Sequence, residues 1–271
     1  MKKEQRKTGN MGSYTLPYFF LKYDLIYLDF LNRKLPKIIE NIVVKQTKTL
    51  KRKAKKLDVK SRTTLENAWS ELETATRRKG GSSKEFELDE KATKLLIQMM
   101  ETKGFPFHTN EFIRDMSLVY LVTKFENFLG KVLKITLEKK PELLMTCQKT
   151  INFEEILKLG KYESVKDHMI KKEIDSIINQ DIMAVEKLFE EKFNVDLPKY
   201  ANWNEFKERF CRRNILVHTE GMPNTTYRSK TGYKGADVPL HVTSQYLKRS
   251  IEVFNQMSYE IAWALYVKFK E

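Results

Sequence analysis

The sequence predicts an all-α protein. Segments with helical spacing of apolar residues fill most of the chain, and the prolines fall mostly between them, where a helix is not interrupted. The clearest segment is 242–270, in which apolar residues recur every three or four positions after a cap at Thr243 or Ser244. The expected helices cover residues 18–57 with a kink at Pro36, 62–79, 86–103, 109–140, 165–193, 203–219 and 242–270, with a shorter one near 152–160.

Extended structure is expected at most as a short β-hairpin within residues 223–242. A span of this length without a helix is unusual in a packed domain and favours a functional role. It carries Arg228, Lys230 and Lys234 close to tyrosines, a mixture suited to RNA phosphates and stacked bases. A surface loop without a ligand is the alternative interpretation.

Charge divides the chain unevenly. Residues 1–108 hold 24 Lys or Arg against 13 Asp or Glu, and Lys45–Arg62 alone has nine basic residues and one acidic residue. Such a block repels itself unless solvent or a polyanion neutralises it, so it is either a solvated face or an RNA-binding surface. We expect a basic helical N-terminal region (1–85) and a helical domain (86–271). The RNA-binding candidates in the basic region are Lys51, Arg52, Lys53, Lys55 and Lys56.

The segment from Arg212 to Gly221 carries the strongest functional signal. Arg213, Asn214 and His218 supply a phosphate clamp, an orienting amide and a proton-transfer group. These are the groups needed for attack on a phosphodiester without a metal. On a helical wheel Asn214 falls inside the apolar stripe, with Arg213 and His218 at its borders. These two diverge by about 140° on one helix, so two helices around a two-fold axis would serve one cleft better. The alternative is a solvated Arg213 and a His218 that caps the helix.

A carboxylate lies in the apolar stripe of the 109–140 helix. Glu126 shares this stripe with Val119, Val122 and other apolar residues, so it is expected to face the core or an interface. A carboxylate in that position needs a cation, and Arg213 is the obvious candidate. Such a pair would hold the guanidinium in place whether or not the site is catalytic.

Other kinds of site find no support in the sequence. Cys147 and Cys211 are far apart, which suggests a reducing compartment, a cytoplasmic protein and buried thiols. The four histidines lack metal-ligand spacing, and the glycines at 79–84 read as a linker and not a phosphate loop. We therefore expect no metal and no cofactor. The apolar run at 18–29 is interrupted by charges, so neither a signal peptide nor a membrane span is expected.

The segment 213–221 resembles the HEPN superfamily, all-α domains that carry an Arg-x4–6-His motif whose second residue is usually polar. Arg213, Asn214 and His218 match that motif, and Arg212 is a second candidate for the basic position. The resemblance is specific at the motif. It therefore supports the interpretation of these residues as a site.

More loosely, the resemblance extends over residues 86–271, through Phe125–Leu129 on an earlier helix and through Asp237–Thr243. It implies a homodimeric, metal-independent endoribonuclease of the toxin or antiviral-defence type. The 2′-OH would attack the adjacent phosphate and leave a 2′,3′-cyclic phosphate and a 5′-OH. His218 would act as general base or acid, and Arg213 would stabilise the phosphorane.

The expected partners are RNA, a second copy of the chain, and an inhibitory or sensor protein, with no membrane partner. The RNA is expected to be single-stranded or looped, and DNA is expected to be spared because the chemistry needs a 2′-OH. The main alternative is a non-catalytic helical module that binds nucleic acid or protein. In that case the motif would be retained for packing in the dimer.

Overall fold

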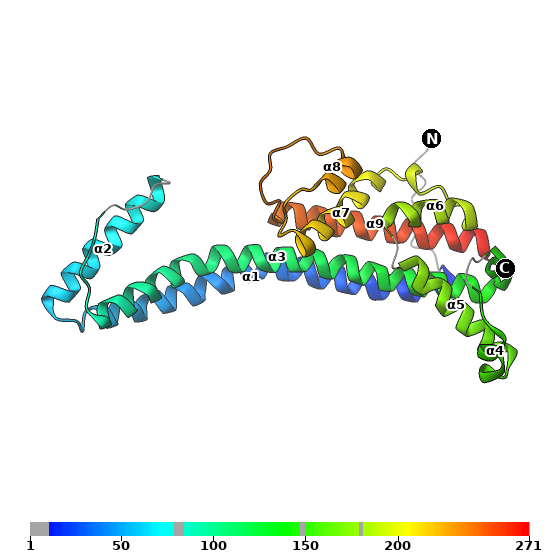
Figure 1. The fold of residues 1–271 in the computed structure, drawn as a ribbon, viewed down its shortest axis with the longest axis horizontal. Helices are drawn as coiled ribbons and strands as arrows, with labels where there is room; N and C mark the ends of the chain where they lie inside the picture. Colours follow the sequence, from blue (N-terminus) through cyan, green and yellow to red (C-terminus); the bar gives the residue numbers. More distant parts are fainter. Residues whose placement is uncertain (1–10, 79–83, 147–149, 179–180, 271) are drawn as a thin grey trace. The chain divides into compact units, whose positions relative to one another are not determined.

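The computed structural model describes residues 11–78, 84–146, 150–178 and 181–270, and within these residues it is all-helical, as predicted. No strand occurs in the described part of 223–242, so the hairpin allowed there is absent (Figure 1). None of the helices searched in these ranges is long and apolar enough to cross a membrane. The helices are α1 (Thr15–Ala54), α2 (Val59–Arg78), α3 (Glu90–Lys139), α4 (Phe153–Leu159), α5 (Tyr162–Ile178), α6 (Ile182–Phe193), α7 (Trp203–His218), α8 (Thr225–Thr231) and α9 (Ser244–Phe269), with 3-10 helices at Gly12–Tyr14, Pro141–Thr146 and Leu197–Lys199.

The chain forms two compact units. Unit 1 contains the described residues of 11–32 and 114–270, and unit 2 contains those of 33–113. α1 and α3 each contribute residues to both units. This division differs from the boundary expected between residues 85 and 86, because the first turns of α1 pack in the core of unit 1. A boundary drawn from charge composition does not follow that packing.

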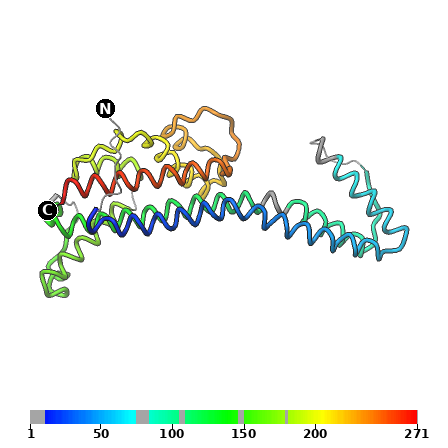
Figure 2. Tube along the Cα trace, turned by 180° about the vertical axis from the view of Figure 1, so that it is seen from behind, coloured from blue at the N-terminus to red at the C-terminus, as the bar shows by residue number. Residues whose placement is uncertain are grey.

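Unit 1 is built around α3 and α9. Phe125 of α3 and Phe254 of α9 meet Phe206 of α7, with ring centroids 4.8 Å apart in both contacts to Phe206. α1 lies beside α3, where Asp24 and Lys124 form an ion pair of 3.2 Å (Figures 1 and 2). α1 and α7 therefore pack on the same central helices.

α3 is longer than expected. The sequence predicted two helices, 86–103 and 109–140, but the structure has one continuous helix through Pro106. A proline inside a helix costs about 3 kcal/mol. Apolar residues on both sides of it offset this cost by packing, with Leu95 buried in unit 2 and Leu121 in unit 1.

The starts of two helices were missed because their caps were not recognised. The expected helix 165–193 is divided into α5 and α6, and the Asp181 side chain caps α6 by accepting from the N–H of Met183 at 3.0 Å. In the same way Asn224 caps α8 by accepting from the N–H of Tyr227 at 2.8 Å. On α9 the predicted Thr243 cap is confirmed.

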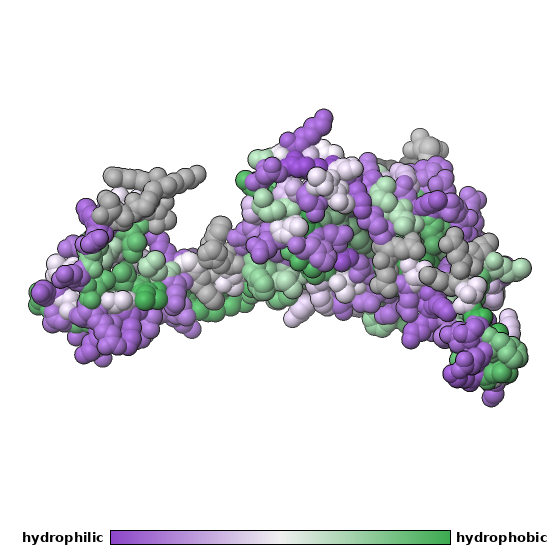
Figure 3. All heavy atoms as spheres, viewed as in Figure 1, coloured by the Kyte–Doolittle hydropathy of each residue, from purple (hydrophilic) through white to green (hydrophobic). Residues whose placement is uncertain are grey.

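Unit 2 is smaller and has its own core. Leu50 of α1, Leu65 of α2 and Leu95 of α3 are buried together. Around α2 this unit shows mainly hydrophilic residues with a smaller hydrophobic patch (Figure 3). The basic segment Lys45–Arg62 belongs to this unit, whereas the Arg213 motif belongs to unit 1.

Candidate functional site

The apolar face of α7 is uncovered at its C-terminal end. The predicted stripe is confirmed for Trp203, Phe206 and Phe210, which are buried. It is wrong further along, where Asn214 is exposed and the Val217 side chain is 53% exposed, while Cys211 and Ile215 take over the buried positions. The physical reason is that the packing of neighbouring helices does not extend over the last turns. Asn214 therefore lies on the core side of α7 but outside the core.

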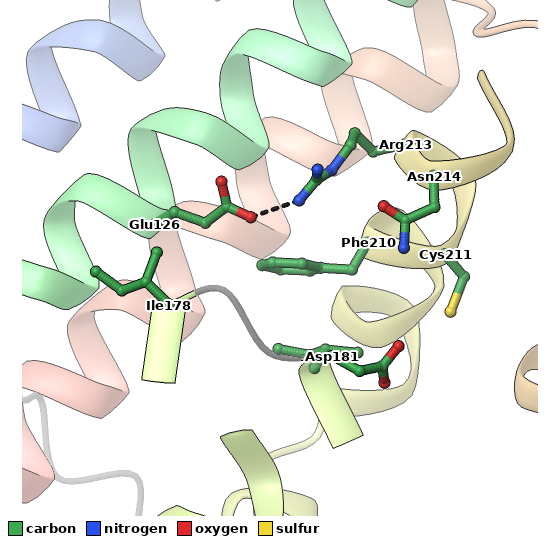
Figure 4. A pocket seen from close by; sticks show the side chains of 8 residues that line it. Glu126, Ile178, Asp181, Phe210, Cys211, Arg213 and Asn214 are labelled. Carbon is green, nitrogen blue, oxygen red and sulfur yellow. Dashed lines mark hydrogen bonds and ion pairs between the residues drawn. The ribbon is translucent and has the colours of Figure 1, made fainter. Parts of the chain in front are cut away.

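A pocket of about 320 Å³ lies at this uncovered end. α3 contributes Glu126, the start of α6 contributes Asp181, and α7 contributes Arg213, Asn214 and the buried Cys211 (Figure 4). The side chains of Arg213 and Asn214 leave α7 in different directions, and the guanidinium is directed at Glu126. The pocket thus presents a cation, an amide and two carboxylates on a partly apolar wall.

The predicted contact between Glu126 and Arg213 is confirmed. Nη2 of Arg213 donates to Oε1 of Glu126, and the two side chains are 26% and 22% exposed. Burial raises the pKa of the Glu126 carboxyl, although the Arg213 guanidinium acts in the opposite direction. The Nε atom of Arg213 is buried and has no hydrogen-bond partner among the described residues. The guanidinium is therefore oriented by one carboxylate but not saturated, a condition that a bound anion could relieve.

Arg212, the second candidate for the basic position, has a structural role. Its Nε donates to Glu208 at 3.1 Å and to the Tyr227 hydroxyl at 3.2 Å, and its Nη1 donates to the Leu240 carbonyl at 3.0 Å. The Tyr246 hydroxyl donates to the same Glu208 carboxylate, and burial raises its pKa well above the ordinary value. Arg212 thus holds α8 and the segment before α9 against α7. Its donors are therefore engaged within the fold and are not available for the role expected of Arg213.

His218 and Asn214 are exposed, and within the described residues neither has a hydrogen-bond or ion-pair partner. His218 is the last residue of α7, and the N–H of Thr219 closes the final turn on the Ile215 carbonyl at 2.9 Å. A polar amide directed into a packed face would need a partner, but Asn214 needs none here because solvent reaches its amide. Both groups are accessible to a ligand at the end of α7.

The cations of the 223–242 segment are mostly engaged within the fold. Arg228 donates to the Gly235 carbonyl at 2.9 Å and to Asp237 at 2.6 Å, which holds its own loop closed. Lys230 forms an ion pair with Asp181 beside the pocket. Lys234 alone of the three is exposed without a partner among the described residues. Arg228 and Lys230 therefore stabilise the fold, which differs from the expected RNA-binding surface.

The basic block of unit 2 behaves differently. All five of its candidate side chains are exposed, and in the described part of the chain none is paired with an acidic residue. One contact is made, from Lys53 to the Gln98 amide oxygen at 3.5 Å. Those five residues are Lys51, Arg52, Lys53, Lys55 and Lys56. Their charges are available to a polyanion.

One pair beside the motif was missed by the sequence analysis. Nδ1 of His241 lies 2.8 Å from Oδ2 of Asp115, and the N–H of Val242 donates to Oδ1 of the same carboxylate at 2.7 Å. Asp115 precedes Glu126 by about three helical turns, so both carboxylates lie on one face of α3. The spacing of these two carboxylates along α3 was the sequence signal that could have revealed the pair. The pair fastens the segment before α9 to α3.

Cys211 is a buried thiol, and burial raises its pKa to about 11. Cys147 lies outside the described residues. No group of three or more His, Cys, Asp or Glu side chains within the residues searched is arranged to hold a metal ion. Comparison of the chain with protein-family models, curated proteins and solved structures found no match.

Proposed function

We propose that the chain is a metal-independent endoribonuclease whose active site is the uncovered end of α7. The observation that carries the proposal is the arrangement of the motif. Arg213 and Asn214 line the pocket, and His218 follows Asn214 by about one helical turn, exposed and within about 40° of it around α7. Glu126 holds the guanidinium in place, while His218 remains accessible. The resemblance to HEPN ribonucleases supports the same residues.

In the proposed reaction an RNA phosphate occupies the space over Asn214. The ribose 2′-oxygen attacks the phosphorus as it loses its proton, and the 5′-oxygen leaves as it gains one. His218 carries out one of these proton transfers and a solvent water carries out the other, and Arg213 stabilises the charge of the phosphorane. Asn214 orients the phosphate or the imidazole. The products are a 2′,3′-cyclic phosphate and a 5′-OH, and DNA is spared because it lacks the 2′-OH.

RNA reaches this site, in our proposal, as a single strand or a loop bound through its phosphates to the basic block of unit 2. The unpaired charges of that block support this assignment. The side chains of Arg228 and Lys230 do not support a role in RNA binding, because both are engaged in ion pairs within the fold. Lys234 remains a candidate contact in unit 1. The biological setting of a toxin or antiviral effector, with an inhibitory or sensor partner, belongs to the same proposal.

A second function has one observation in its favour. The ion pair with Glu126 partly neutralises Arg213, which would suit a structural motif in a non-catalytic module that binds nucleic acid or protein. The two functions differ in turnover. A binding module would retain RNA without producing new ends.

The deciding experiment incubates the purified full chain with total RNA in EDTA and identifies the ends that are formed. We expect cyclic phosphates from the wild type, no cleavage by His218→Ala or Arg213→Ala, and full cleavage by the control His168→Ala, which removes a histidine of α5. Circular dichroism should be the same for all four proteins. Wild-type activity in His218→Ala would end the assignment of this motif. RNA binding without any cleavage would favour the module.

A further inference from the structure

The first half of α1 has two apolar faces. One face is buried in unit 1 through residues such as Leu21, Leu25 and Leu28. The other carries seven large apolar side chains that are 44 to 69% exposed, which we call the α1 stripe. They are Leu16, Phe19, Phe20, Tyr23, Ile26, Tyr27 and Phe30. At 100° per residue these positions fall within about 120° of one another, so they form one continuous surface.

The area of the α1 stripe is large for a free surface. An aromatic side chain can bury roughly 150–250 Å², so seven half-exposed residues offer on the order of 700 Å². Tyr120 of α3 is 43% exposed and extends this surface, because its hydroxyl donates to Asp24 of α1. The largest apolar patch on a typical monomer is about 300–600 Å², whereas each partner in a standard interface contributes about 800 Å². The stripe therefore matches an interface.

The chemistry of the stripe points to a second copy of the chain. Between Leu16 and Phe30 no charged residue of α1 lies within it, and its edges carry both signs, with Lys22 on one side and Asp24 on the other. From α3, the Lys131 ammonium lies 5.4 Å from the centre of the Phe20 ring at one edge. An acidic protein or RNA would be drawn instead to the unpaired cations of unit 2. A membrane-surface helix needs a cationic solvent face, but the opposite face of α1 is buried in the core. A continuous apolar stripe with charges only at its edges suits an isologous contact, in which the same surface is used twice.

The stripe lies away from the motif. On α3, Lys124 and Tyr120 contact α1, whereas Glu126 contacts α7. On α9, Asn255 contacts α1, whereas Ser250 contacts Arg209 of α7. α3 and α9 thus separate α1 from α7, and a dimer formed through the stripe leaves both α7 ends open.

We propose that two copies of this chain associate through the α1 stripe about a two-fold axis. This assignment does not depend on the ribonuclease proposal, since it concerns the opposite side of α3 and α9. It also differs from the two-fold contact at residues 203–219 that the divergence of Arg213 and His218 suggested. The two arrangements make different predictions for mutants of each surface.

The test is sedimentation equilibrium of the full chain with two matched double variants. Tyr23→Glu/Tyr27→Glu removes two stripe residues that are 69% and 62% exposed, and we expect the dimer Kd to rise by at least about 100-fold. The control, Phe153→Glu/Leu157→Glu on α4, has the same spacing and similar exposure, at 72% and 65%, and should remain dimeric. A wild-type chain that is still monomeric at about 100 µM would overturn the proposal. An unchanged dimer Kd in the stripe variant would overturn it as well.

A second measurement covers the case in which the stripe variant fails to fold. Tyr23→Cys in a Cys147→Ser background should be cross-linked to a dimer by a short bismaleimide, because Tyr23 lies at the middle of the stripe. Leu157→Cys in the same background should remain uncross-linked. Equal cross-linking of the two, or a monomeric chain that binds anionic vesicles through Tyr23, would contradict the self-association.

Discussion

Two adjacent arginines of α7, Arg212 and Arg213, differ in how many of their hydrogen-bond donors the fold uses. Arg212 lies in a polar cluster in which Glu208, Tyr227 and the Leu240 carbonyl take up its donors, and its side chain is 12% exposed. Arg213 has a single carboxylate partner, a buried Nε without one, and a place at a pocket. The difference shows that a cation is available for function only where the fold leaves its donors unused.

The same distinction separates the two basic regions. Arg228 and Lys230 find Asp237 and Asp181 within their own unit and are used to hold the fold together. Among the described residues, no cation of the Lys45–Arg62 block forms an ion pair with an acidic side chain, and Asp58 is the one acidic residue within the block. Similar compositions therefore lead to an internal network in one region and an open surface in the other.

The largest expected effect is on stability. Arg212→Ala should lower the free energy of unfolding by about 3 kcal/mol, because the Leu240 carbonyl and one Glu208 oxygen lose a largely buried charged donor, while Arg209 still pairs with Glu208 at 3.2 Å. Arg213→Ala should cost only about 1 kcal/mol, since its partner Glu126 already has a raised pKa and can take up a proton. Urea unfolding followed by circular dichroism measures both. Equal losses would show that the two arginines are structurally equivalent.

The next effect concerns RNA affinity. Replacing the five cations of the basic block by Gln should reduce the slope of log affinity against log salt by about 3.5, because each phosphate contact on a single strand contributes roughly 0.7. Arg228→Gln/Lys230→Gln should change the slope little. The cleavage rate at saturating RNA should be nearly unaffected in the block variant. An unchanged slope there would make the block a solvated face or a protein-binding surface. The five positions are Lys51, Arg52, Lys53, Lys55 and Lys56.

A smaller effect distinguishes the two possible dimers. With the two-fold axis on the α1 stripe, mixing Arg213→Ala and His218→Ala subunits should restore no cleavage, because each site belongs to one chain. If α7 lay at the two-fold axis instead, random mixing would restore about a quarter of the activity. The measurement is cleavage of RNA by the two inactive proteins together. Unmixed subunits at the same total concentration are the control.

The smallest effect is expected at Cys211. Its pKa of about 11 means that the thiol is protonated below that pH and becomes a thiolate only as the pH rises through it. At pH 8 roughly one thiol in a thousand is ionised, so iodoacetamide should leave Cys211 unmodified in the folded protein. Cys211→Ala should retain RNA cleavage. Rapid alkylation at pH 8, with loss of activity, would assign the thiol a role in the pocket.

Much of the site followed from spacing along the chain. The helix 203–219, its stop after His218, and the Glu126–Arg213 pair could be predicted because each depends on periodicity and on the need of a buried carboxylate for a cation. The choice between Arg212 and Arg213 could not. It depends on Tyr227 and Leu240, which reach α7 only because α8 and the following segment fold back on it.

The sequence by itself determined the helical class, the Thr243 cap, the concentration of basic residues in Lys45–Arg62 and the placement of Arg213 and His218 on one helix, because these depend on composition or on neighbours within a few turns. Only the tertiary structure decided that α3 continues through Pro106, that Asn214 opens onto a pocket, and that α1 exposes a second apolar face. The physical reason is coverage. Whether an apolar face or a charge is buried depends on which distant segment packs against it, and spacing along one helix does not contain that information.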